Sequence, residues 1–168
     1  MTTLYAHPYN LDAVGFYFDS LEAFNTQSEN LTDKYGQPVE EFEIQVIDGD
    51  DAELFEACGI HQGNLDVWFD EIEGLEEYKK AGLYCLCACI HYRLDVAMQK
   101  LDDISLMQCN LKDAAQELFD EIYLPDVPES VRFYIDYEMF ARDCEIGGDM
   151  TEFEFKGETW TCTNACGV

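Results

Sequence analysis

The sequence predicts an α+β protein, an elongated chain of three small domains: an α+β domain at residues 1–60, a helical domain at 61–108 and an α+β domain at 109–168. Stretches that alternate apolar and polar residues, as half-buried strands do, occur towards both ends of the chain. Apolar residues recur at helical spacing between these stretches and through the middle third. An aromatic content of 14% supplies enough apolar surface for a folded core despite the high charge.

The first domain is expected to hold three strands and two helices. Residues 3–9 and 13–19 predict strands, and Ser20 can cap a following helix that Gly36 can end. Phe42, Ile44 and Val46 then alternate with polar residues, which predicts a strand with carboxylates on its outer face. The stretch DGDDAELFEAC predicts a short helix, whose dipole favours acids in the first turn.

The middle third is expected to form helices at about 64–73, 75–92 and 94–101, followed by a strand at 104–108. In the last domain Asn110 can cap a helix that Pro125 stops. Asp126 and Glu129 have the spacing of a capping box, which predicts a helix from there to Gly147-Gly148. A hairpin turning at Lys156-Gly157 would place Phe153 opposite Trp160.

The eight cysteines are expected to be buried, reduced thiols in a cytoplasmic protein. The N-terminus lacks the pattern of a signal peptide, and the longest apolar run, Leu83 to Ile90, cannot cross a bilayer. Cys89 with His91, or Cys162 with Cys166, could ligate a metal, but no C-x-x-C pair is present. We therefore expect no catalytic residue, no metal and no cofactor, because nucleophile, phosphate-loop and metalloprotease motifs are also missing.

The net charge of -27 is far larger than a folded protein of this size needs for solubility. Duplex DNA carries one charge per roughly 1.7 Å of axis, so this charge matches about 46 Å of duplex. Three explanations remain open at this point: imitation of DNA, adaptation to salt, and an acidic module that binds one cationic partner.

The acids that the predicted helices and strands place on the surface are the candidate functional residues. They occur in all three thirds of the chain and comprise Glu22, Glu29, Asp33, Glu41, Glu43, Asp50, Asp51, Asp66, Asp70, Glu73, Glu77, Asp113, Glu117, Asp120 and Glu121. Like charges four residues apart on a helix are destabilising, so such faces favour a binding role over selection for stability alone.

The stretch VPESVRFYIDYEMFARD, from Val127 to Asp143, resembles the C-terminal signature of the ArdA antirestriction family. Its most specific part is Tyr134-Ile135-Asp136-Tyr137 with Arg142-Asp143. The N-terminal half is similar more loosely, through the aromatic strand at Gly15 to Phe18 and the acidic strand before Asp48-Gly49-Asp50.

The resemblance implies an acidic, mostly dimeric protein of mobile genetic elements that imitates bent B-form DNA. Such proteins occupy the DNA-binding groove of type I restriction-modification enzymes, where their carboxylates meet the Lys and Arg that otherwise bind phosphates. The implied partners are that enzyme and a second copy of the chain, with no nucleic acid and no membrane. A small acidic immunity-type or chaperone-type module that neutralises a single basic protein remains the alternative.

A dimer is expected because one subunit has charge for only about 46 Å of duplex. The candidate contact is the segment Val127 to Asp143, where apolar groups occur on more than one helix face. These groups are Tyr134, Ile135, Tyr137, Met139 and Phe140.

Overall fold

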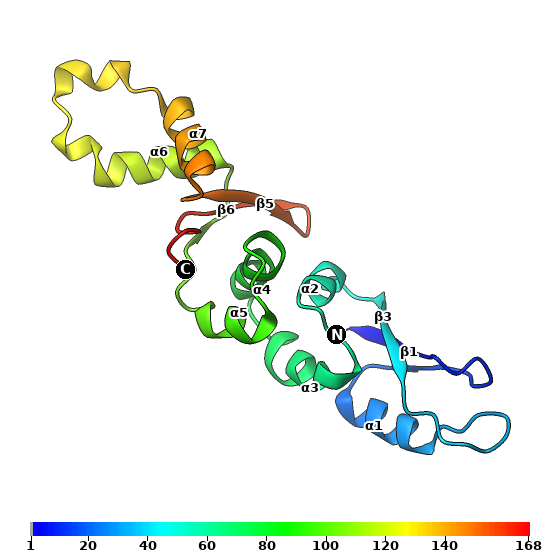
Figure 1. Cartoon of the computed structure of the whole chain (residues 1–168). Helices are drawn as coiled ribbons and strands as arrows, with labels where there is room; N and C mark the ends of the chain where they lie inside the picture. The colour runs from blue at the N-terminus through cyan, green and yellow to red at the C-terminus, as the bar shows by residue number, and fades with distance from the viewer. Residues whose placement is uncertain (1) are drawn as a thin grey trace. The chain divides into compact units, whose positions relative to one another are not determined.

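The computed structural model describes residues 2–168 and confirms a mixed α+β fold with two small antiparallel sheets (Figure 1). The chain divides into two compact units, Met1–Lys80 and Ala81–Val168, with the division inside helix α4 (Glu77–Tyr84). The division into three domains and the elongation stay predictions. No helix among residues 2–168 has the length and apolar character that a membrane crossing requires.

The first unit is built on a sheet of order β2-β1-β3, with strands β1 (Thr3–Pro8), β2 (Phe16–Phe18) and β3 (Phe42–Asp48). Helix α1 (Leu21–Asn30) lies against one face of this sheet (Figure 1). Phe24 of α1 contacts Phe18 with ring centroids 5.0 Å apart and Phe42 at 5.9 Å. This aromatic cluster is the core that holds α1 on the sheet.

Local signals explain where α1 begins and ends. The Ser20 side chain accepts a hydrogen bond from the backbone N–H of Ala23 at 3.3 Å, as an N-cap does, which confirms the predicted start. The helix ends at Asn30 and not near Gly36, because Leu31 already has an extended backbone. Tyr35, which falls within the helix expected to end at Gly36, is instead 70% exposed in the turn that follows α1.

The remainder of the first unit is helical. Helix α2 (Ala52–Ala57) and a 3-10 turn (Gln62–Asn64) precede α3 (Leu65–Val67), which continues as a π-helical turn, Trp68–Ile72. Trp68 is fully buried and packs edge-on against Phe55 of α2, with ring centroids 4.9 Å apart. This contact joins α2 to α3.

The second unit has a sheet of order β4-β6-β5, formed by β4 (Leu106–Met107), β5 (Thr151–Phe155) and β6 (Glu158–Cys162). Phe153 pairs with Trp160, and Lys156 and Gly157 both have positive φ, so the predicted hairpin is confirmed. Helix α4 continues as a π-helical turn, Cys85–Cys89, and is followed by α5 (Leu94–Lys100). All eight cysteines are free thiols.

Helices α6 (Leu111–Ile122) and α7 (Tyr137–Gly147) pack against each other beside this sheet (Figure 1). The Asn110 side chain caps α6 as predicted, accepting from the Asp113 N–H at 2.9 Å. The predicted helix start at Asp126 to Glu129 is wrong. Residues 129–134 form a 3-10 segment, Ile135 is extended, and Asp136 caps α7 by accepting from the Met139 N–H at 3.0 Å.

A buried ion pair closes the core of the first unit. Lys80 Nζ lies 2.6 Å from Asp51 Oδ2, and the two side chains are only 8% and 10% exposed. Removing one partner of such a pair leaves a charge buried without its counter-ion. The pair therefore ties the start of α4 to the N-terminal end of α2.

Replacing Lys80 with alanine should lower the free energy of unfolding by about 3–5 kcal/mol, because the Asp51 carboxylate would stay buried without its lysine. Urea denaturation followed by circular dichroism measures the change. Lys34→Ala is the matched control, since Lys34 also lies 2.6 Å from its partner, Asp12, but in solvent. Equal losses in the two variants would contradict a special role for the buried pair.

Candidate functional site: the exposed carboxylates

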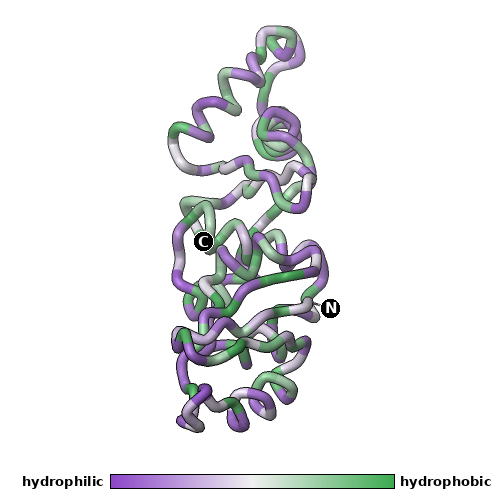
Figure 2. Tube along the Cα trace, turned by 90° about the vertical axis from the view of Figure 1, so that its right-hand side faces the viewer, coloured by the Kyte–Doolittle hydropathy of each residue, from purple (hydrophilic) through white to green (hydrophobic). Residues whose placement is uncertain are grey.

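The candidate site is a distributed set of carboxylates, and the structure exposes most of those predicted. Exposed members on both units are Glu22, Glu29, Glu41, Glu43, Asp50, Asp66, Asp70, Glu77, Asp113, Glu117 and Glu121. Hydrophilic residues recur along the whole trace rather than in one segment (Figure 2). The distribution fits many weak contacts better than one binding pocket.

Asp51 is a correction to the predicted set. It is 7% exposed, and its carboxylate binds Lys80 inside the first unit. The sequence pattern placed it in the first turn of α2, where acids are usually solvated, but the lysine comes from α4, twenty-nine residues further along the chain. Asp51 therefore stabilises the fold and offers no charge to a partner.

Glu73, another member of the predicted set, is only partly exposed. Its Oε1 accepts a hydrogen bond from the Thr2 backbone N–H at 2.6 Å. Uniform α-helical spacing would place Asp66, Asp70, Glu73 and Glu77 on one face, but Trp68–Ile72 is a π-helical turn. A π turn holds more residues than an α turn, so residues beyond it are rotated relative to those before it.

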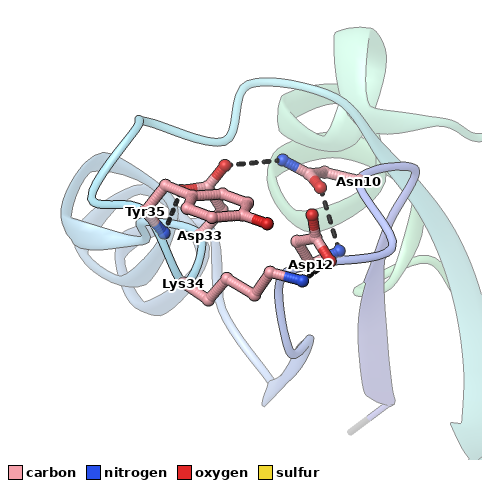
Figure 3. Close-up of polar contacts among 5 residues, drawn as sticks. All are labelled: Asn10, Asp12, Asp33, Lys34 and Tyr35. Atoms are coloured by element: carbon pink, nitrogen blue, oxygen red, sulfur yellow. Dashed lines mark hydrogen bonds and ion pairs between the residues drawn. The ribbon is translucent and has the colours of Figure 1, made fainter.

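Asp33 belongs to a network between two loops (Figure 3). Its Oδ1 accepts from the backbone N–H groups of Gln37 and Tyr35 at 2.9 and 2.8 Å, and Asn10 donates to Oδ2 at 3.3 Å. The Gln37 backbone hydrogen bond is the main cause of a lowered Asp33 pKa. Lys34 contacts Asp12 at 2.6 Å in the same network, so these charges fix the loops to each other.

On strand β3 the predicted alternation holds. Phe42 is buried and Glu43 exposed, and Glu43 pairs in register with His7 of β1. The neighbouring Glu41 lines an open hollow of about 220 Å³ together with Tyr9, Asn10, Pro38, Val39 and Glu40. One edge of the first unit thus presents successive carboxylates.

Helix α6 presents the most regular acidic face. Ala114 and Ala115 are fully buried beneath it, while Asp113, Glu117 and Asp120 line an open hollow of about 370 Å³ with Gln116. Asp120 accepts a hydrogen bond from the Tyr137 hydroxyl at 2.5 Å, which raises the pKa of that phenol.

The pKa values of two thiols in the second unit are raised, in part by nearby carboxylates. Burial, followed by the carboxylates of Asp113, Glu117 and Glu152, raises the pKa of Cys109. Cys166 is exposed, yet its hydrogen bond to Asp149, 3.0 Å long, raises its pKa as well.

Most carboxylates lack a cation of their own chain. The sequence has 36 acids and nine bases, so at least 27 acids have no Lys or Arg to themselves. Lys80 is paired with Asp51 inside the core, and Lys112 pairs with Glu138 at 2.6 Å between α6 and α7. The surplus charge is available to an external cationic surface.

The residues predicted for a dimer contact fall into two groups. Tyr134 and Met139 are 85% and 63% exposed, and Ile135 is partly exposed. Tyr137 and Phe140 instead pack edge-on against Phe119 of α6, with ring centroids 5.6 and 5.1 Å apart. They hold the α6–α7 pair together within one chain.

Sequence reasoning missed two features of the surface. Phe133 is 96% exposed, because the chain around it is a 3-10 segment and not the predicted helix. Glu152 accepts from the Leu111 N–H at 2.6 Å and so supports the start of α6 from a neighbouring strand. The contact between Glu152 and Leu111 joins residues that are far apart in the sequence, so no local pattern predicts it.

Among residues 2–168, no group of three or more His, Cys, Asp or Glu is arranged to hold a metal ion.

Comparison with known proteins identifies one family. The model of the family described as antirestriction protein (ArdA) matches residues 17–156 of the 168. No curated protein sequence matches the chain. The match includes the signature stretch at Val127 to Asp143 and confirms the resemblance inferred from it.

If surplus carboxylates repel one another in the folded state, added salt should stabilise the protein. Raising NaCl from low to high concentration should increase the midpoint of thermal unfolding, because screening shortens the range of repulsion. Scanning calorimetry across a salt series measures this. A midpoint that fell with NaCl would show that attractive ion pairs dominate instead.

Proposed function

The chain belongs to the ArdA antirestriction family, and from that premise we propose that it blocks type I restriction-modification enzymes by presenting carboxylates in place of DNA phosphates. The occupied surface would be the DNA-binding groove of the enzyme, whose Lys and Arg normally hold the DNA backbone. Inhibition needs no catalysis, and its setting would be the cytoplasm of a cell that receives DNA from a mobile element.

The observation that carries this proposal is the exposure of many carboxylates without cations of their own. They lie on a helix and a strand of the first unit and on α6 of the second. A DNA phosphate backbone is likewise a series of separated single charges, and a protein groove binds it through many modest contacts. An immunity-type module would more simply concentrate its acids in one patch on one unit.

Each exposed acid should contribute little to the binding free energy, and the whole set should contribute most of it. Glu22→Ala or Glu117→Ala alone should weaken binding less than about fivefold. Joint neutralisation of Glu22, Glu29, Asp113, Glu117 and Glu121 should weaken it progressively to loss. The measurement is displacement of DNA from the methyltransferase core of a type I enzyme, repeated at rising NaCl, which should weaken binding steeply.

The matched control is the joint replacement of neutral exposed residues on the same helices, Asn25→Ala with Gln116→Ala, which should leave displacement unchanged. A single acid whose loss abolished binding in a folded protein would favour the immunity-type alternative. Failure of the unaltered chain to displace DNA from any type I core would refute the proposal.

We also propose that the protein acts as a two-fold dimer. Tyr134, Met139 and Phe133 expose apolar surface on the segment between α6 and the middle of α7, which an isologous contact would bury. Arg132 is committed within its own chain, because it donates to the backbone carbonyls of Val127 and Leu124 at 3.1 and 3.2 Å. It therefore shapes the segment rather than bridging subunits.

Sedimentation equilibrium at moderate salt and micromolar concentration should give twice the chain mass. Tyr134→Asp should shift the equilibrium towards monomer, because it places a charge in the apolar contact. Tyr35→Asp, at a tyrosine of the first unit that is 70% exposed, should leave the mass unchanged. A strictly monomeric unaltered protein would rule out the dimer.

A further inference from the structure

The first sheet has two aromatic faces, only one of which is covered. Leu4 and Ala6 of β1 point into the core and are fully buried, so Tyr5 and His7 lie on the opposite face. Tyr5 pairs in register with Tyr17 of β2, and their ring centroids are 4.8 Å apart. The His7 ring follows at 6.2 Å from Tyr5. We call Tyr5, His7 and Tyr17 the outer aromatic face.

A glycine holds the Tyr5 ring in this position. A Cβ on Gly15 would lie 2.7 Å from the Tyr5 ring carbon that bears the hydroxyl, and 2.2 Å from the Ala6 carbonyl oxygen. Real carbon atoms do not approach that closely, so the ring lies over a backbone site that only glycine leaves open. Tyr5 therefore packs over Gly15 beside the more exposed Tyr17, and this packing pre-organises the face.

The face is open to solvent. Tyr17 is 62% exposed, and His7 and Glu43 are exposed beside it. The phenol and imidazole rings thus display apolar surface and π-electrons that the fold of the first unit does not use. Exposed aromatic side chains of this kind are the residues that most often anchor a partner.

Charge indicates what the outer aromatic face would bind. Strands β1, β2 and β3 contain no Lys or Arg, while Glu43 lies opposite His7. Elsewhere the chain places its own lysines over rings: Lys34 over Tyr35, Lys100 over Tyr92 and Lys156 over Phe155. Within residues 2–168 no such cation lies over Tyr5 or Tyr17, so this place is left for an external one.

We propose that the outer aromatic face receives an arginine side chain of the protein partner, with the guanidinium stacked on the tyrosine rings and paired with the Glu43 carboxylate. Arginine fits better than lysine because its planar group stacks on rings and binds a carboxylate through two N–H donors. Glu43 lies diagonally from Tyr5 across one strand spacing, about 7–8 Å between backbones, within reach of a guanidinium on the ring. The proposal rests on the proposed function and adds a contact that phosphate imitation alone does not require.

The test uses the full chain with hexaarginine and hexalysine as probes, followed by nuclear magnetic resonance of the tyrosine rings. The ring signals of Tyr5 and Tyr17 should shift with hexaarginine and markedly less with hexalysine. Tyr17→Ala should weaken hexaarginine binding about three- to tenfold, and Tyr17→Phe, which keeps the ring, should not. Tyr35→Ala is the control for loss of an exposed tyrosine outside the face.

The same variants are then compared for displacement of DNA from the type I methyltransferase core. A selective loss in Tyr17→Ala supports the proposal. Equal binding of the two peptides, or equal losses in Tyr17→Ala and Tyr35→Ala, overturns it while the proposed function stands. A change of oligomeric state in Tyr17→Ala would show that a second copy of the chain covers the face, and would overturn it too. Failure of the unaltered chain to displace DNA would instead remove the proposed function.

Discussion

Repulsion among the carboxylates is the main force that the rest of this structure has to overcome. With nine bases for 36 acids, the chain cannot neutralise itself, and burial of apolar groups has to hold each unit together against its own charge. The first unit does so with the Phe18–Phe24–Phe42 cluster and the edge-on contact of Phe55 with Trp68. The second does so with a paired hairpin and the aromatic contacts between α6 and α7. Aromatic residues suit this task because each buries a large area per residue.

Four of the nine bases have clear structural roles. Lys80 is inside the first core, Lys34 fixes two loops, and Lys112 links α6 to α7. Arg132 shapes the segment before α7 through backbone carbonyls. None of these roles neutralises a continuous stretch of surface. The exposed acidic faces therefore keep most of their charge, because the acids outnumber the bases by 27.

Local chemistry was readable from the sequence, and long-range pairing was not. Ser20 and Asn110 were identified as caps because a side chain at that position needs only the next turn of helix. The alternation around Phe42 and the Phe153–Trp160 pair follow from the two-residue period of strands. The burial of Asp51 depends on a lysine from another helix. The position of Glu73 depends on a π-helical turn, which residue spacing in the sequence does not predict. The late start of α7 reflects competition between two acids, Asp126 and Asp136, that could each cap a helix. The family was found because its signature is itself local.

The field created by the carboxylates also acts on the thiols of the protein. Thiolate is the reactive form of cysteine, and negative neighbours oppose its formation. Burial, and after it the carboxylates of Asp113, Glu117 and Glu152, raise the pKa of Cys109, and a hydrogen bond to Asp149 raises the pKa of Cys166 although this thiol faces solvent. Both pKa values lie above the usual cysteine value, so at neutral pH these thiols are held in their unreactive form. At these two positions the charges that oppose compactness also slow attack by electrophiles and oxidants, because they help to keep the thiol protonated.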